Sequence, residues 1–230
     1  MNRSFIAGSM MFLSMIACGG TPEGALAVDG AEELLSSAAS YSGTLSSSFT
    51  SSNENWRLNY FNQDSSTPAT WDGKGAIAVT DYTDGLTYQF TAPWTGNLSN
   101  YANATLTFSI KDVPVPGGTG SGAKVGNSQA IQLISKDWST VLNWPITASA
   151  APGQSYTTYT LKFAADGKWW KTGTNALATS ADFRKVLSNL GYLRIVAEYI
   201  DGNDTCSLDS VSITPTTTTA SIGGSSNEGI

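Results

Sequence analysis

The stretch that decides the fold runs from Thr179 to Ile213 and reads TSADFRKVLSNLGYLRIVAEYIDGNDTCSLDSVSI. Thr179 is a hydroxyl helix cap, and Asp182 follows three residues later, where it can complete a variant capping box. The apolar residues that come next share one face of a helix through their i, i+3, i+4 and i+7 spacing: Phe183, Val186, Leu187 and Leu190. Gly191 stands where a left-handed C-terminal cap is expected. We therefore predict one short helix, at about residues 180–190, that lies flat on the rest of the domain.

The remainder of this stretch, and nearly everything before it, has the pattern of strands and turns. Alternating apolar residues within the runs indicate strands with one face on a core. The predicted strands cover residues 76–80, 87–91, 105–111, 130–135, 156–163, 193–200 and 206–213. Residues 113–127 are rich in Gly and Pro and predict a long exposed loop. Antiparallel strands of this kind pack as two sheets, so we predict a mainly β fold, a β-sandwich or jelly roll with one docked helix.

The N-terminus has the pattern of an export signal. Residues 1–17 hold one positive charge and then an apolar run that is too short to span a bilayer. The end of the run, Met15-Ile16-Ala17-Cys18, resembles a bacterial lipobox, which implies lipidation of Cys18 and attachment to a membrane through that lipid alone. The alternative is ordinary signal-peptidase cleavage after Ala27, which would give a secreted, extracellular protein.

Differences in amino-acid composition divide the rest of the chain into a tether, a domain and a tail. Residues 18–47 are small and polar, which predicts a flexible tether. Residues 48–214 hold the predicted strands and helix and form the expected domain. Residues 215–230 are rich in Thr, Ser and Gly and predict a disordered tail.

Charge and residue types narrow the classes of function. The net charge of −6 excludes a basic surface for nucleic acid. The chain has no histidine, which removes the commonest general base and the Ser/His and Cys/His nucleophile pairs. No phosphate-binding loop or nucleophile-elbow motif is present either. We therefore predict that the protein is not an enzyme; the alternative, a glycosidase-type hydrolase, would need two carboxylates facing one groove.

Several blocks, in order along the chain, resemble the laminin IV (laminin B) domain. They are residues 48–56 with Trp56, Trp71, residues 84–101, Trp169 or Trp170, residues 181–190, and Leu208-Asp209-Ser210-Val211-Ser212-Ile213. The resemblance covers residues 48–214 and implies a jelly roll of the galactose-binding-like type. No cysteine modules like those of epidermal growth factor flank the domain, so a laminin-like role in a basement membrane is not implied.

Related jelly rolls often bind carbohydrate, so exposed tryptophans are candidate platforms for sugar rings. Trp56 and Trp71 occupy family positions and are expected in the core. The candidate ligand-binding residues are Trp94, Trp138, Trp144, Trp169 and Trp170. The alternative for each is a partly buried aromatic at the rim of the core. Because neighbours on a strand point to opposite faces, one member of the Trp169-Trp170 pair should face away from the core.

The resemblance also implies a structural calcium ion. In some carbohydrate-binding jelly rolls an acid of the last strand shares a calcium with oxygens from the first strand, and Asp209 with Glu54 are the residues here that match. Calcium needs six to eight oxygens. The alternative is that each acid is hydrogen-bonded to backbone at a sheet edge.

Together these observations predict a non-catalytic, exported surface lipoprotein of the cell envelope. Its domain is expected to serve adhesion or carbohydrate binding, with a polysaccharide or an extracellular protein as the partner. The alternative is a structural or protein-interaction module of the envelope without a sugar site.

Overall fold

The structure is a computed structural model that describes residues 41–60, 66–82 and 88–216. All of these residues belong to one compact unit, Ser37–Ile230. The predicted signal peptide, Cys18, most of the predicted tether and nearly all of the predicted tail lie outside the described residues. Among the described residues, no helix is long and apolar enough to cross a membrane.

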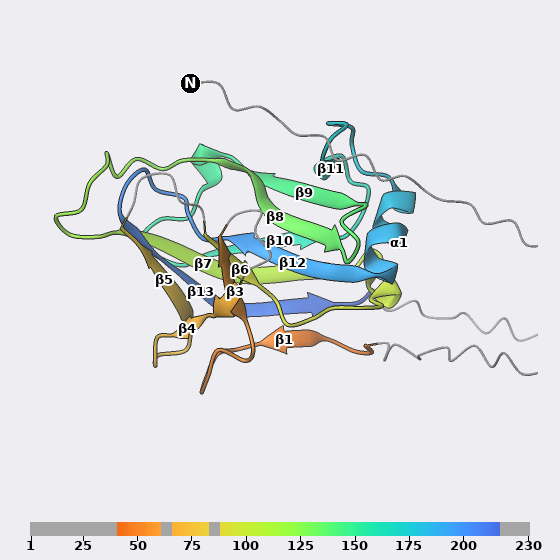
Figure 1. Cartoon of the computed structure of the whole chain (residues 1–230), viewed down its shortest axis with the longest axis horizontal. Helices are drawn as coiled ribbons and strands as arrows, with labels where there is room; N and C mark the ends of the chain where they lie inside the picture. Colours follow the sequence, from red (N-terminus) through yellow and green to blue (C-terminus); the bar gives the residue numbers. More distant parts are fainter. Residues whose placement is uncertain (1–40, 61–65, 83–87, 217–230) are drawn as a thin grey trace, which may run out of the picture. The chain divides into compact units, whose positions relative to one another are not determined.

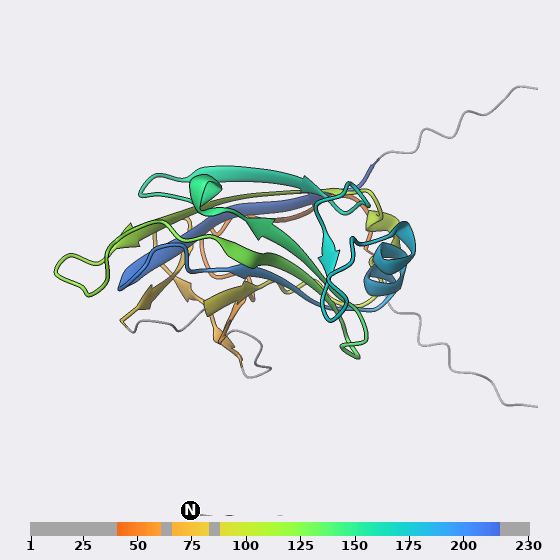
Figure 2. The same ribbon diagram turned by 90° about the horizontal axis from the view of Figure 1, so that it is seen from above.

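Two antiparallel sheets pack face to face, with α1 (Ser180–Ser188) at one end (Figures 1 and 2). Sheet A has the order β10-β7-β13-β5-β4, and β1 also pairs with β13. Sheet B has the order β11-β9-β8-β12-β6-β2-β3. The strands of sheet A are β1 (Leu45–Ser47), β4 (Thr70–Trp71), β5 (Ile77–Asp81), β7 (Thr105–Pro114), β10 (Thr157–Lys162) and β13 (Asp204–Thr214).

The strands of sheet B are β2 (Arg57–Tyr60), β3 (Ser66–Pro68), β6 (Tyr88–Thr91), β8 (Asn127–Ser135), β9 (Val141–Ile146), β11 (Trp170–Lys171) and β12 (Leu190–Val196). Two short 3-10 turns, η1 (Ser99–Tyr101) and η2 (Ala148–Ala150), join the sheets. The predicted fold class is confirmed, and each of the seven predicted strands is present with shifted ends. Strands β1, β2, β3, β4, β9 and β11 were not predicted.

The domain begins earlier than predicted, because β1 is part of sheet A. Leu45 pairs with Ile213 and Ser47 pairs with Val211. The last three residues of the predicted tether are therefore folded. At the other end β13 finishes at Thr214.

The core lies between the sheets and is filled by alternating residues of the long strands. In β7 the buried positions are every second residue, Leu106, Phe108, Ile110 and Asp112. Trp56 is fully buried, as predicted, and its indole N–H donates to Ser47 Oγ at 2.8 Å. The same prediction was wrong for Trp71, which is 38% exposed. Its indole N–H reaches the carbonyl oxygen of Phe49 at 2.7 Å, so the ring covers the edge of the core from outside.

The helix α1 forms because its N-terminal signal is complete. The amide of Asp182 donates to Thr179 Oγ1 at 3.2 Å, and Asp182 Oδ2 accepts from the amide of Thr179 at 3.0 Å. The carboxylate of Asp182 also accepts from the Thr179 hydroxyl at 2.7 Å. This bond, then the bond from the Thr179 amide, and a smaller effect of Lys171 at 3.0 Å lower the pKa of Asp182 to about 2. Phe183 of the apolar stripe is buried against Trp169, with ring centroids 5.6 Å apart. The helix therefore closes this end of the sandwich.

Gly191 does not have the predicted role of a left-handed helix cap. The C-terminal cap of α1 is Asn189, with φ −149°, and Gly191 lies within β12. A Cβ on Gly191 would lie 2.7 Å from the Cα of Lys136. Glycine is needed here because β12 and the end of β8 approach closely.

We predict that Phe183→Ala lowers the free energy of unfolding by about 3–5 kcal/mol, because it leaves a cavity between α1 and Trp169. Urea denaturation followed by tryptophan fluorescence measures the change. Arg184→Ala, at the exposed neighbouring position, is the control and should change stability by about 0.5 kcal/mol or less. Equal losses in both variants would contradict the docking of α1 described here.

Candidate functional site

Two of the five candidate tryptophans are core residues. Trp94 is 8% exposed and meets Trp56 edge to face at 5.6 Å. Trp169 is 1% exposed and lies between Phe163 and Phe183. Neither ring has a free face on which a ligand could stack, so the prediction that Trp94 and Trp169 bind a ligand was wrong. Both rings are buried because other aromatic side chains pack against them.

Trp144 and Trp170 are partly exposed, on different sides of sheet B. Trp144 pairs with buried Ile131 and packs against the core from the inner face. Trp170 pairs with Asn143 on the outer face, and its indole N–H donates to the carbonyl oxygen of Ser128 at 3.1 Å. Of the adjacent pair, Trp169 faces inward and Trp170 outward, as the sequence predicted.

Trp138 is the candidate with the most distinctive geometry. It lies in the tight turn between β8 and β9, 38% exposed, with φ 57°. A bulky residue in the left-handed region is strained, and such strain gathers at functional sites. The turn is locked by Asp137 Oδ1, which accepts from Ser135 Oγ at 2.7 Å and from the amide of Ser139 at 3.1 Å. These bonds lower the pKa of Asp137 to about 2.

The turn places Trp138 against two residues of β12. The ring centroid of Trp138 lies 5.8 Å from that of Tyr192. The Cζ atom of Arg194 lies 4.4 Å from the Tyr192 centroid and 5.3 Å from the Trp138 centroid. A guanidinium at these distances is attracted to both rings. We call Trp138, Tyr192 and Arg194 the aromatic platform.

A row of polar side chains on the outer face of sheet B supports the platform. Arg194 pairs with Thr91 of β6 and with Gln132 of β8, and Gln132 pairs with Asn143 of β9. These side chains are at most 6% exposed. Gln132 Nε2 donates to Asn143 Oδ1 at 3.0 Å, and Gln89 Nε2 donates to Gln132 Oε1 at 2.7 Å. A buried network with its groups bonded to one another fixes the positions of its members, Arg194 among them.

A pocket of about 330 Å³ adjoins the platform at Tyr192. Its lining carries the amides of Asn97 and Asn189, hydroxyls and one ammonium group; the lining residues are Thr95, Gly96, Asn97, Lys136, Ser188, Asn189, Leu190, Gly191 and Tyr192. The backbones of Gly96 and Leu190 bond in both directions, at 2.7 and 2.8 Å. A rigid wall, one aromatic ring and several donors and acceptors are the features of a site for a small polar ligand.

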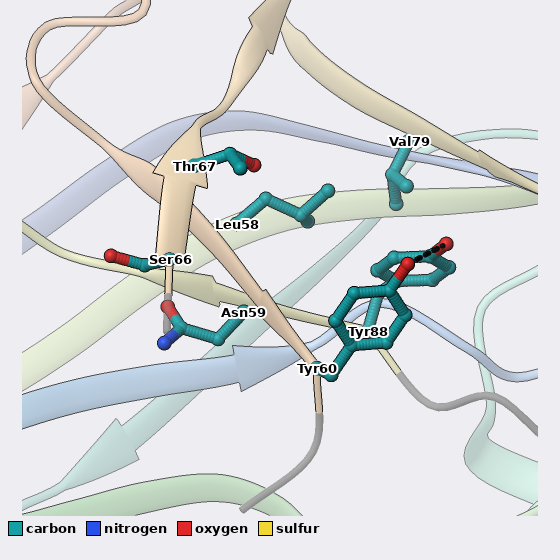
Figure 3. Close-up of a pocket in the computed structure, with 7 residues that line it drawn as sticks. All are labelled: Leu58, Asn59, Tyr60, Ser66, Thr67, Val79 and Tyr88. Atoms are coloured by element: carbon teal, nitrogen blue, oxygen red, sulfur yellow. Dashed lines mark hydrogen bonds between the residues drawn. The ribbon is translucent and has the colours of Figure 1, made fainter. Parts of the chain in front are cut away.

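A second pocket, of about 300 Å³, lies at the β2–β3 edge (Figure 3). The rings of Tyr60 and Tyr88 lie 4.9 Å apart beside apolar Leu58 and Val79, and the Tyr88 hydroxyl donates to Tyr60 at 3.4 Å. This bond, followed by burial and then by the charges of Tyr60 and Asp81, raises the pKa of Tyr88 to about 12. The pocket is less polar than the one at the platform and therefore suits an apolar group better.

At the predicted calcium site the carboxylate of Glu54 is in contact with backbone N–H groups. Glu54 Oε1 accepts hydrogen bonds from the amides of Ser48 at 3.1 Å and Phe49 at 2.6 Å, so the loop turns N–H groups toward the carboxylate. No group of three or more His, Cys, Asp or Glu residues within the described parts of the chain is arranged to hold a metal. Burial raises the pKa of Asp209. Around Glu54 the contacts match the alternative, an acid hydrogen-bonded to backbone.

Two packed sheets and one docked helix define a β-sandwich domain of the jelly-roll class. The chain belongs to the laminin B (domain IV) family, whose model matches residues 87–228, more than half of the chain. The predicted resemblance is thereby confirmed. A comparison with curated proteins finds no match.

One solved structure has the same fold, and two others match at lower TM-scores. The L4b domain of human laminin alpha-2 matches with a TM-score of 0.57 at 14% identity, over 76% of this chain and 98% of that domain. A xylan-binding module, CBM15, matches with a TM-score of 0.45 at 17% identity, over 75% of this chain and 95% of the module. An agarase matches at 0.46 and 11% identity, over 76% of this chain but only 25% of the enzyme.

Sequence reasoning identified Trp138 but missed Tyr192 and Arg194. Arg194 lies at an outward position of the predicted strand 193–200, and such positions are usually solvated, while Tyr192 lies just before that strand. One sequence signal could have pointed to them: Tyr192 and Arg194 are two positions apart, so on a strand they lie on the same face and are close enough to stack. Only the pairing of β12 with β8 shows that the Trp138 turn comes to lie beside them.

We predict that Gln132→Ala destabilises the domain, because it leaves buried polar groups of Gln89 and Asn143 without their partner. Each such group costs about 1–3 kcal/mol in the free energy of unfolding. Urea denaturation measures this loss. The control is Gln129→Ala on the same strand, whose only side-chain bond to Gln132 is long, at 3.5 Å; a control as damaging as Gln132→Ala would show that the row is not a network.

Proposed function

We propose that this domain binds polysaccharide through the aromatic platform and the adjoining pocket. One observation carries the proposal: Trp138 is held in a strained backbone conformation that stacks its exposed ring beside Tyr192 and over Arg194. Backbone strain of this kind costs about 1–3 kcal/mol and gathers at functional sites. We infer that here it serves to hold the Trp138 ring in the orientation that a ligand needs.

The chemistry of the site matches a sugar. The C–H face of a sugar ring is apolar and stacks on an aromatic face, while its hydroxyls need donors and acceptors. Trp138 and Tyr192 supply the rings. Asn97, Asn189 and Lys136 in the pocket supply polar groups beside them. The buried polar row that includes Arg194 holds the platform in place before a ligand arrives, which lowers the entropic cost of binding.

We further propose that the protein is an exported lipoprotein of the cell envelope, anchored through Cys18, and that it does not catalyse a reaction. The apolar run before Cys18 and the lipobox-like Met15-Ile16-Ala17-Cys18 support the anchor. A domain that captures polysaccharide outside the cell is consistent with this location. Asp112 and Asp204, whose carboxyl groups interact in the core, are at most 1% exposed and so face no groove in which a glycoside could be hydrolysed.

A second function is favoured by the β2–β3 edge of sheet B, where two tyrosines meet. Tyr60 is 41% exposed and its ring lies 4.9 Å from that of Tyr88, and the pocket that both line has apolar walls at Leu58 and Val79. Exposed tyrosines around an apolar pocket suit an apolar side chain of a partner protein. In that case the domain is a protein-interaction module of the envelope.

We predict that Trp138→Ala weakens binding of the polysaccharide selected on a glycan array about tenfold, because a stacked aromatic contributes about 1 kcal/mol beyond its buried area. Isothermal titration calorimetry of the purified protein measures the change. Trp71→Ala is the matched control, because Trp71 is equally exposed at 38% but lies on sheet A. Unchanged affinity in Trp138→Ala, or no binding of the wild type to any polysaccharide at millimolar concentration, contradicts the proposal.

We predict that Cys18 carries the lipid. Expression in a bacterium with a radioactive fatty acid should label the wild-type protein and leave Cys18→Ala unlabelled, with the latter released from the membrane fraction. Equal labelling of both, or a mature N-terminus beginning after Ala27, would show that the chain is processed as an ordinary secreted protein.

A further inference from the structure

Three acidic residues meet inside the sandwich at the end opposite α1, and a fourth is half-buried near them. Asp81 of β5, Asp112 of β7 and Asp204 of β13 all point inward and are 3%, 0% and 1% exposed. The strand register places Asp204 directly opposite Asp81, and Cys206 opposite Asp112. Glu198, just after β12, adds a fourth carboxyl group whose charge acts on Asp204. The sites described above do not use these acids.

Asp112 and Asp204 form a pair within this group. Asp112 Oδ2 accepts a hydrogen bond from the amide of Tyr199 at 2.8 Å, while its Oδ1 accepts none from the described donors. Neither carboxyl oxygen of Asp204 accepts one either. The two carboxyl groups lie within hydrogen-bonding reach of each other. A proton on Asp204 that is donated to Asp112 satisfies both, whereas two ionised carboxylates side by side in the core repel each other.

The pair lies beneath two docked loops at this end of the molecule. The β7–β8 loop (residues 115–126) packs on the β12–β13 loop (residues 197–203) through backbone bonds such as Val115 to Asn203 at 2.9 Å and Val125 to Tyr199 at 2.8 Å. The contact is tight, since a Cβ on Gly202 would lie 2.0 Å from the carbonyl oxygen of Thr119. Figures 1 and 2 both show the β7–β8 loop at the end of the sandwich away from α1.

We propose that the Asp112–Asp204 pair is a pH-sensitive latch, which holds these two loops closed while Asp204 carries a proton and loosens them when that proton is lost. Asp112 connects the latch to the loops through the Tyr199 amide, and Asp204 connects it through Asn203, the next residue in the chain. Repulsion in the pair therefore acts directly on the β12–β13 loop. The loop can relieve the repulsion by moving outward and admitting water.

The direction of the pH effect follows from the environment of the pair. Burial, and then the charges of Asp112, Glu198 and Asp81, raise the pKa of Asp204 to about 8. Burial raises the pKa of Asp112 to about 6, against the lowering effect of the amides of Tyr199 and Val113. Among the other groups that face the pair, Cys206 and Tyr199 also have raised pKa values through burial, so they stay uncharged at neutral pH.

In the open state both acids have ordinary pKa values near 4. The closed state then binds more protons than the open state at intermediate pH, so closure is strongest in acid and is lost as the pH rises toward 8. Below about pH 6 both acids contribute to this dependence. Between about pH 6 and pH 8 the dependence belongs to Asp204, and it amounts to about a tenfold rise in the opening constant per pH unit.

Hydrogen–deuterium exchange of the full-length protein tests the latch between pH 6 and pH 8, with opening constants corrected for the intrinsic exchange rates. The amides of residues 115–126 and 197–203 should open about tenfold more per pH unit in the wild type. In Asp204→Asn, which is isosteric and keeps a donor for Asp112, that slope should disappear. Asp112→Asn is the second variant; it removes one of the charges that raise the pKa of Asp204, so the slope should end at a lower pH than in the wild type. Near-UV circular dichroism shows whether each variant keeps its fold.

Three outcomes would overturn the proposal. The first is a flat profile in the wild type, and the second is an unchanged slope in both variants. The third is a slope shared equally by the amides of β8 and β12, which would mean that the whole domain opens rather than its loops.

Discussion

The structure depends on how β13 fits between β5 and β7. Its inward residues Cys206, Leu208, Val211 and Ile213 are at most 1% exposed and run along the middle of sheet A. Strict alternation would turn Val211 and Ile213 outward, because they are an odd number of residues from Leu208. A bulge between Asp209 and Val211 corrects the phase. Ser210 takes the extra position with φ 40°, so one strained residue keeps the whole last strand in the core.

That bulge has consequences at both ends of the strand. Beyond it, Val211 and Ile213 pair with β1, which attaches the N-terminal part of the domain to sheet A. Before it, the uninterrupted alternation places Asp204 inward as surely as Leu208, although an aspartate is costly to bury. The pairing that builds the core thus also brings Asp204 beside Asp112. Their buried carboxyl groups are a result of strand register rather than of local sequence preference.

Features that depend on local chemistry could be predicted from the sequence. The capping box of Thr179 and Asp182 and the apolar stripe of α1 are short-range signals, and the helix forms where they place it. Features that depend on pairing could not. Strand β9 carries Pro145 and Asn143, which argue against a strand in isolation, yet β8 on one side and β11 on the other hold it in the sheet.

The candidate site shows the same division. The sequence made Trp138 a candidate because it is a tryptophan in a turn-rich segment. The position of its ring, however, depends on a left-handed backbone conformation and on contact with Arg194, which is distant in the sequence. Trp71 was placed in the core by family position, whereas its short strand β4 lies at the sheet edge and leaves the ring outside. Sequence supplies residue types and periodicity. Which face becomes enclosed is settled by contacts between residues far apart in the chain.

Strand β12 connects the platform to the latch and keeps them apart. Tyr192 lies near its start and Tyr199 just beyond its end, about 20 Å away at the rise of an extended strand. Between them β12 pairs with both β8 and β6, and its Leu193 and Ile195 are fully buried. Such central strands open only with the whole domain, whereas loops open locally. Loosening of the β12–β13 loop therefore leaves the aromatic platform in place, because the hydrogen bonds of β12 to β8 and β6 hold the strand while the loop moves.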